Sequence, residues 1–349
     1  MNKKRVGILF GGMSCEHEVS LLSATSVLEN IDREKYEPVP IGITKDGKWY
    51  LYEGDISLIK DGSWEKCENA ELLLTPSNGA PIYVKRADSI FAISIDTIFP
   101  ALHGFGGEDG RLQGLLESAG IPFVGPGSLS SAVCMDKAMT KLVLKNYEIP
   151  QAKAILVTKR EFMGGFDKIE GAAALLSYPL FVKPSAAGSS VGVSKAENPE
   201  ELKKAIEGAL AVGDRVLVEE YVEGAEIEVA VLGGDDLTVS VCGEIAPGSD
   251  FYDYDTKYKN DTAKYYIPAR LDESVSEKIR EYASRIFRAL DCKGLSRVDF
   301  FVKGDRIIFN EINTLPGFTS ISMYPKLLMA SGMSYPDIIS NLIELSLEK

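Results

Sequence analysis

Acidic side chains interrupt two apolar segments near the C-terminus of this chain. Residues 296–302 and 306–313 have the composition of β-strands, and a turn that contains a glycine joins them. Because side chains alternate between the two faces of a strand, one face of this hairpin carries a polar set: Arg297, Asp299, Glu311 and Asn313. Carboxylate and amide oxygens suit Mg²⁺, which binds through one or two carboxylates together with substrate phosphates. The alternative is a surface hairpin with a salt bridge between Arg297 and Glu311.

The register of this hairpin depends on the length of its turn. We predict a three-residue loop at 303–305. The register that follows pairs Val302 with Arg306, Asp299 with Phe309, and Arg297 with Glu311. The opposite face then buries an apolar set: Val298, Phe300, Ile308 and Ile312.

Two glycine-rich segments earlier in the chain are candidate ligand-binding loops. Residues 10–20, FGGMSCEHEVS, lie between a predicted strand and a predicted helix, where open parallel sheets bind ligands. In this loop Glu16 either binds a substrate ammonium or simply complements the helix dipole. Residues 183–193, KPSAAGSSVGV, let backbone N–H groups approach phosphate oxygens, and Lys183 adds a positive charge, although a flexible hairpin is the alternative. Neither segment has dinucleotide-binding or Walker spacing.

Three further segments carry groups suited to a nucleotide or to an acyl intermediate. Residues 216–226 form an apolar strand whose end can hold an adenine edge, with Glu226 accepting the ribose hydroxyls, unless these acids are merely solvated. Residues 251–258, FYDYDTKY, place aromatic side chains and a lysine on a predicted lid, with a packed surface loop as the alternative. Residues 316–325 supply a glycine N–H and several hydroxyls.

Strands and helices alternate through the first third of the chain, which predicts an open parallel sheet. Apolar patterns predict strands at 5–10, 39–43, 97–99 and 122–124 and helices at 18–30 and 113–120. The same patterns predict a helical stretch at 130–147 and strands at 180–183, 216–218 and 226–232. Asn198 and Pro199 predict a capped helix start, and the polar segment 250–264 predicts a long functional loop. The Gly-Pro-Gly at 125–127 marks the first domain boundary.

Composition limits the classes of function. The chain has 349 residues and a net charge of −13, which disfavours binding to nucleic acid. We find no signal peptide and no apolar run as long as a membrane helix, so we expect a cytoplasmic protein that does not bind membranes. Five scattered cysteines and two histidines predict reduced thiols and argue against structural zinc.

The order of these motifs resembles that of the ATP-grasp ligases, and among them the D-alanine:D-alanine ligases of bacterial cell-wall synthesis. The resemblance covers essentially the whole chain and rests on segments 10–20, 103–110, 134–137, 188–192, 252–258 and 310–317. It implies an α/β and α+β fold, in which an N-terminal open parallel sheet domain precedes a two-part ATP-grasp fold whose antiparallel sheets sandwich the nucleotide. The expected domains are residues 1–126, 127–226 and 227–349.

The resemblance also implies an activity and a set of site residues. The enzyme would join two D-alanine molecules through a D-alanyl phosphate, with ATP as co-substrate and two Mg²⁺ ions, which Mn²⁺ can replace, and would form a homodimer. The implied metal ligands are Asp299, Glu311 and Asn313. The implied nucleotide-binding residues are Lys137, Lys183, Ser190, Glu219, Tyr221, Val222, Glu226 and Lys257. The implied catalytic residues are Glu16, Ser189, Tyr258, Arg297, Gly317 and Ser322, and the implied substrate-binding residues are Val19, His103 and Met323.

Two residues bear on the choice of the second substrate. Tyr258 replaces the phenylalanine of members that also use D-lactate, and Met323 replaces the arginine of members that prefer D-serine, so both favour D-alanine. The chain departs from many members at 186–187, where two alanines stand, and at Ile321. Two alternatives stay open: a D-alanine:D-serine ligase, which residues 40–44 also resemble, and a non-catalytic nucleotide-binding regulator with the same fold.

Overall fold

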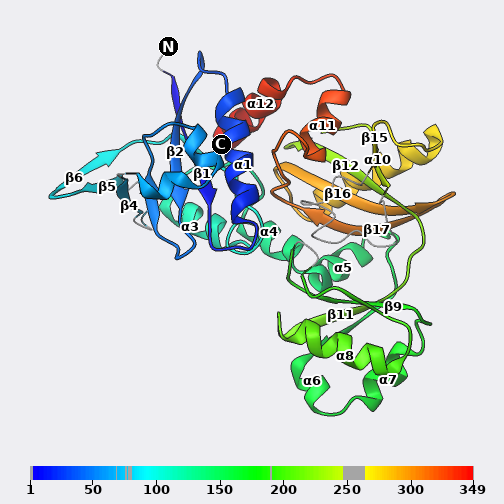
Figure 1. Ribbon diagram of the computed structural model, residues 1–349. Coiled ribbons are helices and arrows are strands. Elements are labelled where there is room, and N and C mark those ends of the chain that lie inside the picture. Colours follow the sequence, from blue (N-terminus) through cyan, green and yellow to red (C-terminus); the bar gives the residue numbers. More distant parts are fainter. Residues whose placement is uncertain are drawn as a thin grey trace.

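The computed structural model describes residues 3–67, 69–74, 77, 81–188, 191–246 and 264–348. Within these ranges the strands form three sheets that follow one another along the chain, and helices pack on each of them (Figure 1).

The first sheet combines parallel and antiparallel strands in the order β6-β5-β4-β3-β2-β1-β7. Its strands are β1 (Lys4–Gly11), β2 (Tyr36–Ile43), β3 (Trp49–Leu51), β4 (Ala70–Leu73), β5 (Ile82–Arg86), β6 (Ser89–Ile93) and β7 (Thr97–Pro100). The predicted parallel arrangement is confirmed for β2, β1 and β7, and β3 to β6 extend it as antiparallel strands that the sequence analysis did not predict. The strand predicted at 122–124 is reduced to a parallel bridge between Phe123 and Ile98. The accompanying helices are α1 (His17–Asn30), α2 (Ser57–Lys60), the 3₁₀ helix η1 (Ser63–Lys66) and α3 (Arg111–Ala119).

The middle sheet is antiparallel, with the order β10-β9-β11-β8. Its strands are β8 (Ala154–Thr158), β9 (Leu180–Pro184), β10 (Ser194–Ala196) and β11 (Arg215–Glu220), and the helices of this region are α4 (Ser128–Met135), α5 (Lys137–Lys145), α6 (Lys159–Met163), α7 (Asp167–Ala173) and α8 (Pro199–Leu210). The helical stretch predicted at 130–147 is divided at Asp136, whose carboxylate accepts hydrogen bonds from the N–H groups of Ala138 and Met139 and so begins α5. Asn198 caps α8 as predicted.

The third sheet is also antiparallel, with the order β15-β14-β12-β16-β17 and with β13 paired to β12. Its strands are β12 (Ala225–Gly233), β13 (Leu237–Val239), β14 (Gly243–Ala246), β15 (Lys264–Tyr266), β16 (Gly294–Lys303) and β17 (Arg306–Asn313). The helices that the structure describes in this region are α10 (Glu273–Ala289), α11 (Met323–Ala330) and α12 (Tyr335–Leu347).

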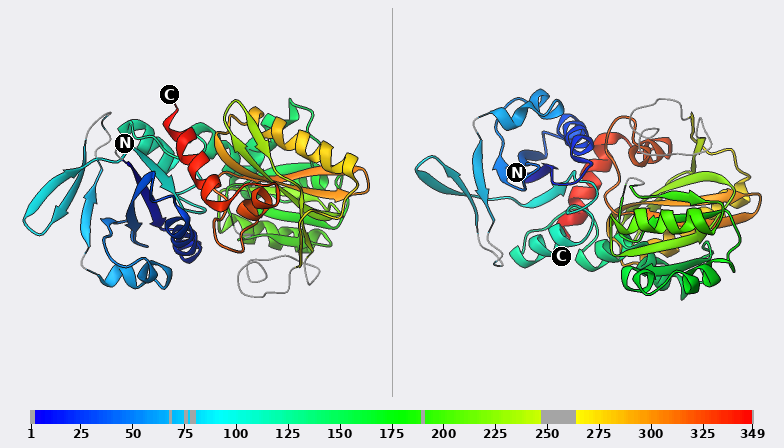
Figure 2. Two further views of the ribbon diagram at one scale, coloured as in Figure 1. Left: turned by 90° about the horizontal axis from the view of Figure 1, so that it is seen from above. Right: turned by 60° about the horizontal axis from the view of Figure 1, so that its bottom comes forward.

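Helix α12 connects the C-terminal part of the chain to the N-terminal sheet. Figure 2 shows it, in red, between the blue strands of the first sheet and the orange strands of the third. On this helix Glu344 accepts a hydrogen bond from the Tyr36 hydroxyl at 2.6 Å, and Ser346 bonds Thr97 at 2.7 Å. These contacts fix the first sheet relative to the third, and therefore also the residues that both contribute to the site.

The hairpin of β16 and β17 differs in register from the prediction. Lys303 pairs directly with Arg306, so the turn has two residues and the predicted three-residue loop is wrong. A bulge follows, because Phe300 pairs with Phe309 but Asp299 pairs with Glu311, which leaves Asn310 as the extra residue. The predicted polar face is nevertheless recovered: Arg297 lies opposite Asn313, next to the Asp299 and Glu311 pair.

The bulge also changes which apolar side chains enter the core beneath this hairpin. That core contains Val298, Phe300, Phe309 and Ile312, so Phe309 takes the place that the prediction gave to Ile308. Phe300 and Phe309 contact each other edge to face, with ring centroids 6.3 Å apart. In the part of the chain that the structure describes, no helix is long and apolar enough to cross a membrane.

Candidate active site

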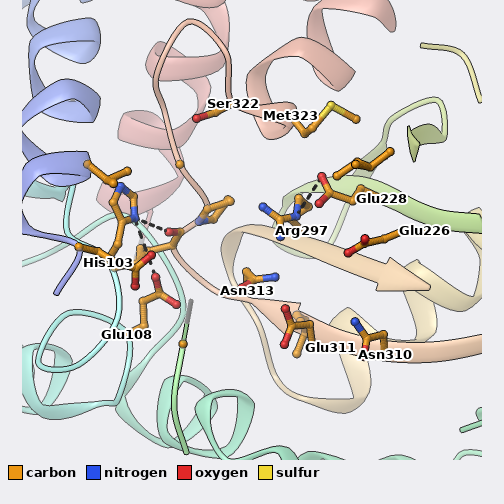
Figure 3. Close-up of a pocket in the computed structure, with 18 of the residues that line it drawn as sticks. His103, Glu108, Glu226, Glu228, Arg297, Asn310, Glu311, Asn313, Ser322 and Met323 are labelled. Atoms are coloured by element: carbon orange, nitrogen blue, oxygen red, sulfur yellow. Dashed lines mark hydrogen bonds and ion pairs between the residues drawn. The ribbon is translucent and has the colours of Figure 1, made fainter. Parts of the chain in front are cut away.

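The three sheets contribute side chains to a common cavity of about 1150 Å³. Figure 3 shows His103 and Glu108 on one side of it and the strands that carry Arg297 and Glu311 on the other. The middle sheet adds Lys183. Single small-molecule pockets measure roughly 300–1000 Å³, so this volume suits a nucleotide together with small substrates.

Asp299 is the buried centre of the polar face of β16 and β17. The residue is 1% exposed and lies opposite Glu311 on the neighbouring strand. Arg297 binds both of its oxygens, with Nε 2.8 Å from Oδ1 and an Nη atom 2.7 Å from Oδ2. The Asn313 amide donates to Oδ2 at 3.0 Å. Asp299 therefore holds an arginine and an amide in fixed positions on the floor of the cavity.

Arg297 contacts a second buried carboxylate, which the sequence analysis did not single out. Glu228 on β12 lies 3.2 Å from the Arg297 Nε. Figure 3 shows the two side chains pointing toward each other. Burial alone would lower the pKa of Arg297, but the negative charges of Asp299 and Glu228 outweigh it and raise this pKa well above its usual range. The guanidinium therefore stays positively charged in the wall of the cavity.

Glu311 faces the N-terminus of α5, which carries a candidate phosphate ligand. The Lys137 Nζ lies 3.3 Å from Glu311 and donates to the Ala187 carbonyl at 2.9 Å. Lys137 therefore spans the gap between the acidic strand pair and the predicted phosphate loop. Asp136 fixes this arrangement, because it caps α5 and also accepts a hydrogen bond from Ser185 of the same loop at 2.5 Å.

The oxygen atoms of this face have the chemistry of Mg²⁺ ligands. Within the described residues no group of three or more His, Cys, Asp or Glu side chains is suited to hold a metal. The available set is instead two carboxylates, Asp299 and Glu311, with the Asn313 amide beside them on the same face. Mg²⁺ commonly uses one or two carboxylates and takes its other ligands from water and substrate phosphates. These three side chains therefore fit Mg²⁺ that is bound together with a nucleotide. They do not form a site that surrounds the metal with protein ligands alone.

A second ion-pair cluster lies at the middle sheet. Glu219 on β11 contacts the Nζ of Lys183 at 2.5 Å and the Nζ of Lys141 at 2.7 Å. Burial alone would raise the pKa of Glu219, but the two lysines outweigh it and lower this pKa. Burial lowers the pKa of Lys141, although the negative charge of Glu219 acts to raise it. Lys141 was not predicted as a site residue, and only the fold brings it here.

Three more of the predicted nucleotide-binding residues line the cavity beside this cluster. Tyr221 follows β11 and stacks on Phe181, with ring centroids 5.8 Å apart. Val222 is buried next to it, and Glu226, the second residue of β12, also lines the cavity. A flat aromatic surface beside backbone groups at a strand end is suited to a purine base.

Glu16 lies where the first sheet meets the cavity. Its side chain is buried, and its backbone N–H donates to Ser14, whose hydroxyl in turn donates to the His103 carbonyl at 2.8 Å. Gly104 packs so closely that an added Cβ would lie 2.6 Å from the Glu16 carboxylate. A carboxylate held in this way is suited to bind an ammonium group. Val19 lines the same region one turn along α1.

Behind Glu16, the buried His103 lies next to Glu108, which is partly buried. The His103 Nδ1 lies 2.9 Å from the Leu315 carbonyl oxygen and 3.9 Å from Glu108. Burial lowers the pKa of His103, with Glu16 opposing the effect. Burial and the charge of Glu16 raise the pKa of Glu108 to about 8. Both groups are therefore neutral near neutral pH, and the sequence analysis did not single out Glu108.

Gly317, Ser322 and Met323 border the cavity above the acidic face, as Figure 3 shows for the last two. Ser322 bonds the Thr319 N–H at 3.0 Å and immediately precedes α11. Met323 is the buried first residue of that helix. Four predicted residues, Ser189, Ser190, Lys257 and Tyr258, lie outside the described residues.

Solved ligase structures share this arrangement of three sheets. The chain superposes on the VanG D-Ala:D-Ser ligase from Enterococcus faecalis with a TM-score of 0.91 and 40% identity, covering 99% of this chain and 100% of that one. It superposes on the D-alanine-D-alanine ligase from Coxiella burnetii with a TM-score of 0.88 and 35% identity, covering 99% and 94%. The fold is therefore that of the ATP-grasp ligases.

Sequence comparison gives the family. The D-ala D-ala ligase N-terminus matches residues 5–126, and the D-ala D-ala ligase C-terminus matches residues 143–344. A D-alanine–D-alanine ligase of Ruminiclostridium cellulolyticum is 50% identical, covering 100% of this chain and 96% of that protein. D-alanine–D-alanine ligase B of Clostridium tetani is 49% identical, covering 99% and 94%. The chain belongs to the D-alanine–D-alanine ligase family.

Proposed function

We propose that this chain uses ATP to join two D-alanine molecules into D-alanyl-D-alanine through a D-alanyl phosphate. The observation that carries the proposal is the convergence of two kinds of binding group in one cavity. Lys137 and Lys183, with the pair of Asp299 and Glu311, are suited to nucleotide phosphates. Glu16 is suited to the ammonium group of an amino acid. An amino acid whose ammonium group binds Glu16 can therefore present its carboxylate to the γ-phosphate of the nucleotide.

In the first step the carboxylate of one D-alanine attacks the γ-phosphorus, which releases ADP and forms the acyl phosphate. Lys183 and Lys137 hold the phosphates and offset the negative charge that develops in the transition state. Mg²⁺, when bound by Asp299, Glu311 and Asn313, supplies Lewis-acid charge neutralisation at the phosphates. Glu16 orients the substrate by holding its ammonium group.

In the second step the amine of another D-alanine attacks the activated carbonyl, and phosphate leaves from the tetrahedral intermediate. Arg297 and the Gly317 N–H stabilise the oxyanion, each by on the order of 3 kcal/mol, as for other oxyanion-binding groups. Ser322 holds the carboxylate of the second D-alanine, and His103 and Met323 shape its site. The roles of Ser189, Ser190, Lys257 and Tyr258 rest on the resemblance of their motifs alone.

A D-alanine:D-serine ligase is the second candidate, because the superposition on the VanG D-Ala:D-Ser ligase has a TM-score of 0.91. Against it stands Met323, whose apolar side chain offers no hydrogen-bond donor to a serine hydroxyl at the start of α11. We therefore assign D-alanine to the second subsite.

The test is to incubate the purified protein with ATP, Mg²⁺ and an equimolar mixture of D-alanine and D-serine and to identify the products by mass spectrometry. We expect D-alanyl-D-alanine, with one ADP and one phosphate formed per dipeptide. A dominant mixed dipeptide would overturn the choice of second substrate. Nucleotide binding without any dipeptide would instead favour a non-catalytic regulator.

Three further expectations belong to this proposal. The domains are residues 1–126, 127–226 and 227–349, the protein is cytoplasmic, and two copies form a homodimer. Light scattering coupled to size-exclusion chromatography tests the dimer, since the chain has a mass of 38.0 kDa and a dimer would have about twice that mass. A monomer at micromolar concentration would contradict it.

A further inference from the structure

Ser23 on α1 lies inside the protein and bonds two groups that come from other parts of the chain. Its side chain is 0% exposed. Its Oγ lies 2.9 Å from the His103 Nε2 and 3.2 Å from the backbone nitrogen of Phe318. The other ring nitrogen of His103, Nδ1, lies 2.9 Å from the Leu315 carbonyl oxygen. Ser23 and His103 together therefore hold both ends of the segment 315–318.

The chemistry of these four groups fixes the direction of each hydrogen bond. A carbonyl oxygen can only accept, so the His103 Nδ1 carries the hydrogen and donates to Leu315. The neutral ring then leaves Nε2 as an acceptor, and the Ser23 hydroxyl must donate to it. The Ser23 oxygen in turn accepts from the Phe318 N–H. The bonds run in one direction, from Phe318 through Ser23 to His103 and then to Leu315.

Gly317 lies between the two residues that this pair holds. An added Cβ on Gly317 would lie 2.7 Å from the Ser322 Oγ, so the segment also packs tightly on the proposed ligand of the second carboxylate. The Phe318 N–H belongs to the peptide plane that follows Gly317, and the Leu315 carbonyl belongs to the plane that precedes Pro316. The Pro316–Gly317 peptide, which carries the Gly317 N–H, therefore lies between two peptides that hydrogen bonds hold in place. A small rotation of this segment would turn the Gly317 N–H away from the cavity.

We propose that Ser23 is a positioning residue that, together with His103, aims the Gly317 N–H at the oxyanion of the tetrahedral intermediate. The inference rests on the proposed function, because it assigns a task within that reaction. Ser23 touches neither substrate in this assignment. It acts by holding the backbone of the segment 315–318, and His103 acts through the same backbone as well as by lining the cavity.

The charged groups around His103 determine how this arrangement responds to acid. Glu16 from the loop before α1 and Arg297 from β16 act on the ring electrostatically, and Glu108 lies 3.9 Å from its Nδ1. A protonated ring carries hydrogen on both nitrogens, so Nε2 can no longer accept from Ser23. The Ser23 hydroxyl would then have to turn, and the network would lose its present direction.

The experiment replaces Ser23 with alanine in the full-length protein and measures dipeptide formation as a function of pH. We expect kcat to fall about 10- to 100-fold, as for small misplacements of catalytic groups, with little change in the KM for ATP. Losing the Ser23 donor removes a bond that favours the neutral ring, so the acidic limb of the kcat profile should move to higher pH. The double variant Ser23→Ala/His103→Ala should lose little more than His103→Ala alone, because the two residues act as a unit.

Ser130→Ala serves as the matched control. Ser130 is also a buried helical serine, on α4, but its hydroxyl donates to the Leu290 carbonyl at 2.7 Å and it does not line the cavity. An equal loss of kcat in Ser130→Ala, or a parental kcat and pH profile in Ser23→Ala, would overturn the inference. Failure of the proposed function is distinguishable from these outcomes, because the unsubstituted protein would then form no dipeptide.

Discussion

Asp299 and Glu311 lie directly opposite each other on β16 and β17, although the two-residue turn between these strands would by itself place Asp299 opposite Asn310. The bulge at Asn310 shifts the register by one residue. Glu311 and Asn313 therefore share the cavity face with Asp299, while Phe309 and Ile312 enter the core. A shift of one residue moves every later side chain to the other face of the sheet, so this single extra residue assembles the proposed metal ligands.

Replacing Glu311 with glutamine should remove the metal-binding capacity of this face. The amide is similar in size but lacks the charge that Mg²⁺ requires, so we expect at least a 100-fold loss of dipeptide formation. The fold should persist, because the Glu311 side chain is 26% exposed and is not part of the core. Binding of Mn²⁺ in the presence of ADP, followed by electron paramagnetic resonance, measures the loss directly.

Glu223→Gln is the control for this prediction. Glu223 lies just before β12, a strand of the same sheet as β16 and β17. Its side chain is exposed and pairs with Lys303 at 2.6 Å, away from the cavity. It should bind Mn²⁺ and form dipeptide as the parent does. If Glu311→Gln bound Mn²⁺ with parental affinity, the metal would have to lie elsewhere.

Local signals in the sequence were sufficient for the elements that frame the site. The alternation of strands and helices predicted β1, α1, β2 and β7, and the Asn198 cap predicted the start of α8. Side-chain alternation also predicted that Arg297, Asp299, Glu311 and Asn313 share a face. The predicted register was wrong. A two-residue turn with a bulge and a three-residue turn without one place these four side chains on the same face, so the alternation could not distinguish the two registers.

Contacts between distant parts of the chain could not be predicted in this way. Lys141, Glu228 and Glu108 became site residues only when the fold placed them beside Glu219, Arg297 and His103. Each is a charged residue in an amphipathic or polar segment, where solvent exposure is the usual outcome. The signal that identifies them is burial of a charge with a partner, which exists only in three dimensions.

Replacing Lys141 with methionine should weaken nucleotide binding. The Nζ atoms of Lys141 and Lys183 both pair with the Glu219 carboxylate. Without Lys141, Lys183 is the remaining partner of this carboxylate in the cluster, and the stronger ion pair draws Lys183 away from the phosphates. We expect the KM for ATP to rise about 10-fold with a smaller change in kcat, which corresponds to about 1.4 kcal/mol of binding free energy. Steady-state kinetics and calorimetric titration with ADP measure it.

Lys145→Met makes the same change on the exposed side of the same helix. It should leave the affinity for ADP unchanged. A parental KM in Lys141→Met, or an equal effect in Lys145→Met, would show that the buried cluster plays no part in binding the nucleotide.

Glu108 should make the protein less stable as the pH rises, whereas a carboxyl group with a lowered pKa has the opposite effect. Burial and the charge of Glu16 raise its pKa to about 8, well above the value of an unfolded chain near 4.5. The folded state therefore binds this proton more tightly than the unfolded state does. The stabilisation is fully present below pH 4.5 and is lost as the pH rises through about 8, with a slope of at most about 1.4 kcal/mol per pH unit.

Glu108→Gln tests this sign, because glutamine stays neutral and its amide oxygen can still accept from the Gly104 N–H. Thermal unfolding of both proteins should be compared between pH 6.5 and 8.5. Burial lowers the pKa of the neighbouring His103 from its ordinary value of 6.5, so this group stays neutral throughout the range. We expect the apparent Tm of the parent to fall relative to that of the variant as the pH rises. Parallel curves would mean that Glu108 is already ionised, and its negative charge would then have to be balanced by the nearby Arg297.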